Sequence, residues 1–241
     1  MATGARRRIT AIAGEGTTQA AEVRESRWEA APAVLAVIIL QLTLGLVSRQ
    51  LGWKLWHLPW WVWILAVVPE TVLLVALAWP PALRTLERIG HRRNVALILL
   101  AIISVANAVA LVALLGSLIS GQETSGGQLL LKGMTIWGTN VIAFGLWFWG
   151  FDRGGPVRRD EPDPPPPDFQ FPQMENPQLA APGWHPRLVD YIYVSFTNSI
   201  AFSPTDAMPL SPWAKLLMLS ESAVSAVSIL LVTARAVNIF K

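Results

Sequence analysis

Long apolar runs separated by short polar stretches constrain this chain more than any other feature of its sequence. The runs are rich in Leu, Val, Ile and Ala, and most are long enough to cross a bilayer as helices, because about 20 helical residues span a hydrocarbon core about 30 Å thick. We therefore expect an all-α integral membrane protein, a helical bundle of about six membrane segments. The expected segments cover residues 30–47, 59–79, 95–118, 129–149, 188–202 and 212–239.

Polar stretches divide the chain into four regions. Residues 1–28 form a polar tail, residues 29–150 a four-helix membrane region, residues 151–187 a Pro-rich connection, and residues 188–241 a short helix, a polar turn and a long final helix. Four consecutive prolines at 164–167 predict polyproline or irregular coil in the connection. The fifth apolar segment, 188–202, spans only about 22 Å as a helix and is therefore either a short crossing helix or a re-entrant one.

Arginine placement predicts the orientation, because cytoplasmic loops of membrane proteins carry an excess of Lys and Arg. The tail is Arg-rich, and the loop after the second segment holds Arg84, Arg88, Arg92 and Arg93. We expect a multi-pass protein of the cell (inner) membrane with a cytoplasmic N-terminus. If residues 188–202 cross, as we favour, the C-terminus is cytoplasmic too. A re-entrant segment would place either the arginine cluster or the C-terminus outside, and the side of the Pro-rich connection stays open.

Composition excludes several classes of function. The chain has no cysteine, which rules out disulfides, thiolate catalysis and Cys-ligated metals. His57, His91 and His185 fall in separate loops without metal-site spacing, and no Ser/His/Asp group or phosphate-binding glycine loop is visible. A tract of basic residues suited to nucleic acid is also missing. We expect no enzymatic activity, no metal, no cofactor and no nucleic-acid partner; the lipid bilayer is the expected surrounding.

Two carboxylates lie within expected membrane segments, where ionisable groups are costly and mark functional sites by default. Glu70 follows Pro69 near the middle of the second segment, and Glu221 lies between two serines in the last segment. Asn107 and Asn140 lie in the third and fourth segments. These groups predict either a path for protons or cations or neutral carboxyl groups that hydrogen-bond to a neighbouring helix.

The stretch from residue 190 to 215 resembles the pore module of tetrameric potassium channels: an aromatic-rich short helix, a tight loop, an Asp, a Pro and a long inner helix. Asp206, Pro209, Ser211, Trp213 and Lys215 carry the likeness after the loop. The filter positions 201–205 read Ala-Phe-Ser-Pro-Thr, without the glycines of the Thr-Val-Gly-Tyr-Gly filter. The resemblance implies a homotetramer that conducts monovalent cations. The implied pore-like turn comprises Thr197, Asn198, Ser199, Ser203, Pro204, Thr205 and Asp206.

The same stretch is similar to a family of uncharacterised bacterial integral membrane proteins. The likeness rests on the Asp190-Tyr-x-Tyr start and the Phe202-Ser-x-x-Asp206 turn. It implies a fold and a membrane location without assigning an activity. Two hypotheses for function follow: an ion-channel-like or ion-transport module with a non-standard filter turn, or a structural or accessory membrane protein without transport activity.

Overall fold

The computed structural model describes residues 29–53, 58–121, 125–159, 161–204 and 206–239. The predicted tail of residues 1–28 and the turn residue Thr205 lie outside the described residues, so both stay predictions. The elements in chain order are α2 (Ala31–Gln50), α3 (Val62–Ala78), α4 (Pro80–Arg88), α5 (Arg92–Ile119), α6 (Gly126–Phe151), η1 (Asp152–Gly154), α7 (Pro156–Arg159), β1 (Phe169–Gln170), α8 (Pro172–Glu175), η2 (Pro177–Leu179), α9 (Leu188–Ala201), β2 (Met208–Pro209) and α10 (Pro212–Ile239).

The predicted helical class is confirmed, and apolar helices of membrane-spanning length are present. Among the described residues, four helices are long and apolar enough to cross a membrane: α2, α5, α6 continued through residue 154, and α10 over residues 212–230. A fifth span results if α3 and α4 are taken together across an 82° bend. The predicted count of six is not confirmed, because α9 has only 14 residues.

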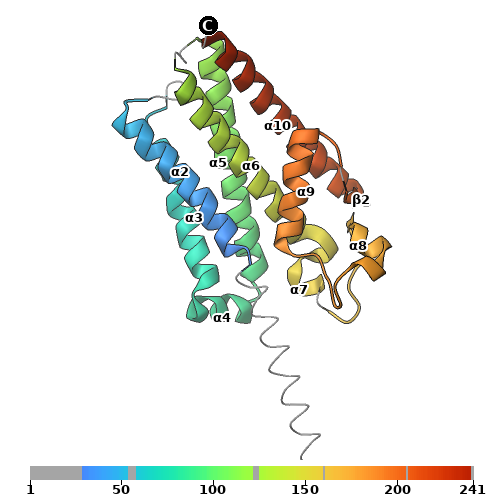
Figure 1. The fold of residues 1–241 in the computed structure, drawn as a ribbon. Coiled ribbons are helices and arrows are strands. Elements are labelled where there is room, and N and C mark those ends of the chain that lie inside the picture. The colour runs from blue at the N-terminus through green and yellow to red at the C-terminus, as the bar shows by residue number, and fades with distance from the viewer. Residues whose placement is uncertain (1–28, 54–57, 122–124, 160, 205, 240–241) are drawn as a thin grey trace, which may run out of the picture.

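The long helices α2, α3, α5, α6 and α10 run side by side, and α4 lies across one end of the bundle (Figure 1). The bend that creates α4 follows from proline chemistry: Trp79 has an extended backbone, and Pro80 begins the next helix. Proline has no N–H for a preceding turn and fits the first turn of a new helix. The last turns of α10 lie at the end opposite α4 (Figure 1).

Helix α6 lies at the centre of the bundle and packs against α2, α5, α9 and α10. Glycine permits the close approach of α6 and α9, because small residues let helix backbones come together. A Cβ atom at Gly145 would lie 2.9 Å from the Cα of Ile192 in α9. Only glycine therefore fits at this point between α6 and α9.

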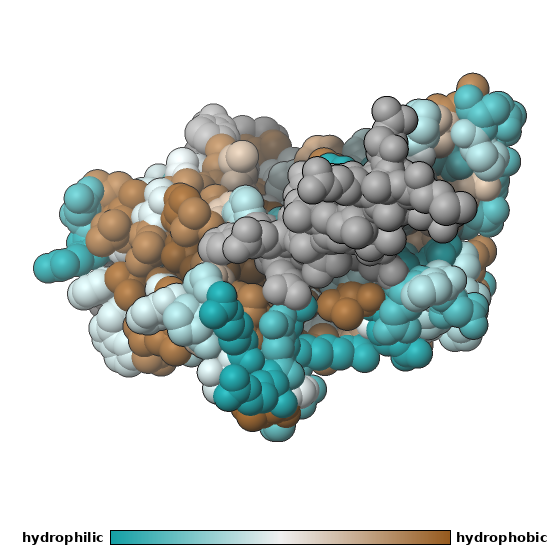
Figure 2. Space-filling view, turned by 90° about the horizontal axis from the view of Figure 1, so that it is seen from below, coloured by the Kyte–Doolittle hydropathy of each residue, from teal (hydrophilic) through white to brown (hydrophobic). Residues whose placement is uncertain are grey.

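The Pro-rich connection is more ordered than its composition predicts. The tract at 164–167 is irregular as expected, but the flanking residues form η1, α7, β1, α8 and η2. Phe169 is fully buried and Phe171 nearly so, among aromatic side chains that include Tyr191, Trp184 and Trp213. Viewed from the α4 end, hydrophilic residues gather on the right-hand side, where the connection lies in Figure 1, and hydrophobic residues are more frequent on the left (Figure 2).

Candidate functional site

Glu221 is fully buried in α10 and is held by two polar side chains of α9. Ser195 hydrogen-bonds to its Oε1, and Asn198 Nδ2 donates to its Oε2 over 2.7 Å. Ser195 and Asn198 lie three residues apart in α9, a spacing that puts them on one face of a helix. We call Ser195, Asn198, Glu221 and Ser222 the Glu221 cluster.

The hydroxyl of Ser195 lies between two acceptors. Ser195 Oγ is 2.7 Å from the carbonyl oxygen of Val141, and it also hydrogen-bonds to Glu221 Oε1. A serine hydroxyl has one hydrogen, so it can donate fully to only one of the two at a time. If Glu221 is protonated, its carboxyl group can donate to Ser195 while Ser195 donates to Val141, so the site can accommodate a proton on Glu221.

The side-chain amide of Asn198 completes the Glu221 cluster. Besides its bond to Glu221, Nδ2 donates to the carbonyl oxygen of Met218 over 3.0 Å, and Oδ1 accepts from Ser222 Oγ over 3.1 Å. Every polar atom of Asn198 and Glu221 therefore has a partner in a region where an unpaired polar group is expensive.

Polar residues continue from this cluster across α6 to α5. Ser225 lies one helical turn after Glu221 and accepts from Asn140 Nδ2 over 3.2 Å. Asn140 Oδ1 in turn lies 3.5 Å from Asn107 Nδ2. All three side chains are buried. We call Asn107, Asn140 and Ser225 the asparagine bridge; it joins helices α5, α6 and α10.

Glu70, the second predicted carboxylate, is also fully buried, but its surroundings are less complete. Gln41 Nε2 donates to Glu70 Oε1 over 3.2 Å. Glu70 Oε2, Gln41 Oε1 and the nearby Thr139 Oγ1 are buried without a hydrogen-bond partner. Gln41, Asn107 and Thr139 line one cavity, so this region adjoins the asparagine bridge. The structure does not place Glu70 in contact with Glu221.

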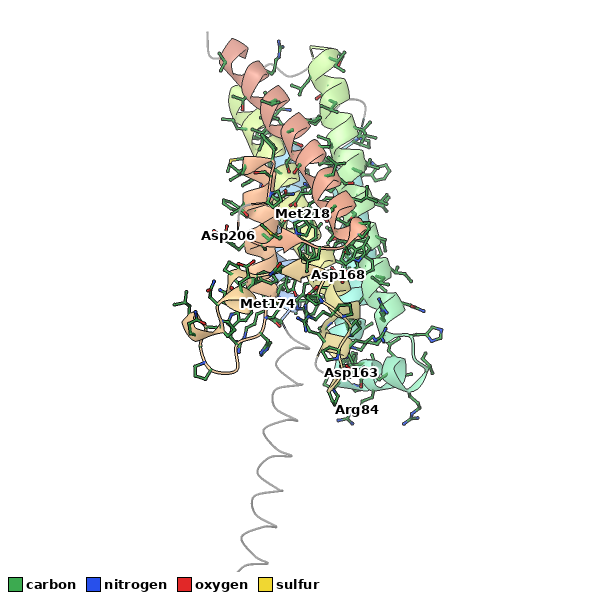
Figure 3. All side chains as sticks on the ribbon, turned by 90° about the vertical axis from the view of Figure 1, so that its right-hand side faces the viewer. Arg84, Asp163, Asp168, Met174, Asp206 and Met218 are labelled. Carbon is green, nitrogen blue, oxygen red and sulfur yellow. The ribbon has the colours of Figure 1, made fainter. Side chains whose placement is uncertain are left out.

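The predicted pore-like turn divides into two parts. Asn198 and Ser199 are buried within the bundle, and Ser199 accepts from Trp137 Nε1 over 3.2 Å; Thr197 is half-buried. Ser203, Pro204 and Asp206 are exposed. In Figure 3 Asp206 lies at the edge of the molecule, whereas Met218, one turn before Glu221, lies among the helices. The structure therefore brings only the α9 part of the turn to the carboxylate.

Helix α9 and helix α10 begin at the same end of the molecule. Asp152, at the end of α6, accepts from Tyr191 in the first turn of α9 over 2.5 Å and from the backbone N–H of Asp168 over 2.7 Å. Asp168 accepts from Trp213 Nε1 at the start of α10 over 2.8 Å. Strand β2 pairs antiparallel with β1 just before α10. The segment between α9 and α10 thus returns to the end from which α9 started.

Sequence reasoning missed three charged residues, two in this region and one near the start of α6. Asp152 is fully buried and pairs with Arg159, whose guanidinium also donates to Tyr191. Lys132, fully buried in α6, was visible in the sequence as the lysine inside the fourth apolar segment. No sequence pattern marked Asp152, because its partners lie 7 to 39 residues away along the chain.

Fold and site together define an all-α bundle that contains, among the described residues, four or five stretches long and apolar enough to span a membrane, and that buries the separate carboxyl groups of Glu70 and Glu221. The chain matches no family model, and it has no significant similarity to a curated protein or to a solved structure. Within the described residues, no group of three or more His, Cys, Asp or Glu side chains could hold a metal ion.

Proposed function

We propose that this chain is a membrane protein that moves protons across the bilayer, with Glu221 as the central proton-carrying group. The observation that supports it is the geometry of the Glu221 cluster: a fully buried carboxyl group bonded to a hydroxyl and an amide, with no basic side chain among these partners. Such a group can lose and regain a proton in place. Buried ionisable groups of this kind occur in proton relays of pumps and transporters.

The proton is the monovalent cation that suits this cluster best. Selectivity for a metal cation requires several oxygen ligands that replace its hydration shell. In the Glu221 cluster the oxygens of Glu221, Ser195 and Asn198 are already engaged with one another or with neighbouring groups. The asparagine bridge and the Glu70–Gln41 pair would extend the path beyond α10, toward the second buried carboxyl group.

The proposed orientation places the α4 end in the cytoplasm and makes α9 re-entrant. Arginines support it, since Arg84, Arg88 and Arg93 lie in or next to α4, and Arg158 and Arg159 lie in α7 at the same end of the bundle. Helix α9 then enters from the cytoplasmic side and returns there before α10 crosses. This proposal departs from the expectation of a cytoplasmic C-terminus, because the last described turn of α10 lies at the opposite end.

Proton flux into proteoliposomes tests the proposal. Purified protein is reconstituted with a pH-sensitive dye inside, and a potassium gradient with valinomycin sets the membrane potential. We expect a potential-driven pH change that Glu221→Gln lowers at least about tenfold, because the amide cannot carry a proton. Glu70→Gln should also lower it. Glu175→Gln is the matched control, since Glu175 is exposed in α8.

Two outcomes of the flux assay and one further measurement separate the alternatives. Folded wild-type protein without flux contradicts transport and favours a structural or accessory role, in which the Glu221 cluster only ties α9 to α10. If Asp206→Asn abolishes the proton flux and Glu221→Gln leaves it unchanged, the result would favour a path along the exposed turn that contains Asp206. Native mass spectrometry of the purified protein then distinguishes a path within one chain from the homotetrameric pore that the channel resemblance implies.

A further inference from the structure

A second site lies on the opposite side of α6 from the Glu221 cluster. A cavity of about 510 Å³ lies between α2, α3, α5 and α6. This volume is typical of pockets that bind small organic molecules. The cavity lies apart from the Glu221 cluster, although Asn107 of the asparagine bridge and Gln41, the partner of Glu70, are among its lining residues.

The mouth of the cavity is apolar and faces the surroundings of the bundle. Leu65 of α3 is 62% exposed, and Val105 and Val109 of α5 are 63% and 47% exposed. In a bilayer these side chains contact lipid, because this side of α3 and α5 carries the apolar surface of candidate spans. A molecule would therefore enter the cavity from within the membrane.

The cavity lining is apolar apart from a few polar side chains, and two of these have an oxygen atom without a hydrogen-bond partner. Gln41 and Thr139 line the cavity and are only 7% and 2% exposed, and both Gln41 Oε1 and Thr139 Oγ1 are buried without a hydrogen-bond partner. The amide nitrogen of Gln41 already has a partner, because Nε2 donates to Glu70 Oε1. A hydrocarbon chain in the cavity would leave both oxygens unpaired, which is costly in an apolar environment.

We propose that this cavity binds a hydrophobic molecule of the bilayer that bears a hydroxyl group, a long-chain alcohol or phenol. A hydroxyl both donates and accepts, so it can donate to Gln41 Oε1 and accept from the hydroxyl of Thr139. The apolar body of the ligand fills the space between α3 and α5. The hydroxyl group of such a ligand would pair with Gln41 Oε1 and Thr139 Oγ1, and its apolar body would contact the apolar mouth of the cavity.

Photolabelling of the full-length protein in nanodiscs tests the assignment. The probe is a C16 alcohol with a diazirine in its chain; labelled peptides are located by mass spectrometry. We expect saturable labelling in α3 and α5 that 1-hexadecanol displaces and hexadecane does not. Thr139→Val should raise the Kd of the probe about tenfold, because a change of this size corresponds to the loss of one buried hydrogen bond. Gln41→Leu should act in the same direction.

Controls separate recognition of the hydroxyl from packing and from misfolding. Thr139→Ser retains the hydroxyl and should label like the wild type, and Thr85→Val makes the same change as Thr139→Val at an exposed position in α4. Equal displacement by alcohol and alkane overturns the proposal, as does unchanged labelling in folded Thr139→Val. Absence of saturable labelling in the wild type overturns it as well. None of these outcomes depends on proton flux.

Discussion

The two buried carboxyl groups differ in how completely their neighbours satisfy them. Glu221 has hydrogen-bond partners on both oxygens, and the same partners are bonded to further groups in α6 and α10. Glu70 has one partner, Gln41, and its second oxygen has none. Two equally buried carboxyl groups can therefore differ in role. The chain itself supplies a hydrogen-bond partner for both oxygens of Glu221, whereas the Glu70 region has polar atoms that a bound molecule could pair with.

The strongest test of this comparison is the loss of Asn198. In Asn198→Leu the carboxyl of Glu221, the carbonyl of Met218 and the hydroxyl of Ser222 all lose a partner. We expect the free energy of unfolding, measured in mixed detergent micelles, to fall by about 3 kcal/mol. Asn94→Leu, at an exposed position of α5, is the control. A loss no larger than in the control would show that the cluster does not stabilise the fold.

The next largest loss in the free energy of unfolding is expected where α9 packs against α6. Gly145→Val places a side chain against the backbone of Ile192, where even a Cβ atom comes within 2.9 Å. The resulting separation of α9 and α6 should cost about 2 kcal/mol. Gly127→Val, which meets open space at the start of α6, should cost much less. Equal effects in the two variants would mean that α9 does not depend on this close approach.

A smaller effect is expected on the Glu70 side. Gln41→Leu removes the single hydrogen bond to Glu70 and also removes an amide oxygen that has no partner. We expect a loss of about 1 kcal/mol, because the two changes act in opposite directions. A loss as large as that of Asn198→Leu, measured in the same micelles, would contradict the difference between the two regions.

The smallest stability effect is expected from Glu221→Gln. An amide can donate to Ser195 and accept from Asn198, as a protonated carboxyl group would, so for a protonated Glu221 the free energy of unfolding should change by less than about 1 kcal/mol. A loss of several kcal/mol would indicate that Glu221 is ionised in the folded protein. The variant thus separates the contribution of Glu221 to folding from its contribution to proton flux.

Sequence patterns predicted the positions of the long apolar helices, although the count of six is not confirmed, because apolar runs and proline stops act over a few neighbouring residues. Pro80 begins α4 at the predicted stop, and Glu70 and Glu221 lie inside helices as expected. The partners of Glu221 could not be predicted, because Ser195 and Asn198 meet it only through the packing of α9 on α10. The order of the Pro-rich connection was missed for a similar reason, since Asp152 and Asp168 fix it through distant residues. The resemblance to a channel pore stays a prediction.

The clasp of Asp152, Asp168, Tyr191 and Trp213 has a consequence for the order in which the chain assembles during synthesis. The groups that fix α9 include Trp213, β2 and Glu221, all of which follow α9 along the chain. A 14-residue helix is too short to be stable across a bilayer by itself. When α9 leaves the ribosome, its partners in α6 have already been made, but Trp213, β2 and Glu221 have not. The polar contacts of α9 are therefore completed only after the beginning of α10 has been made.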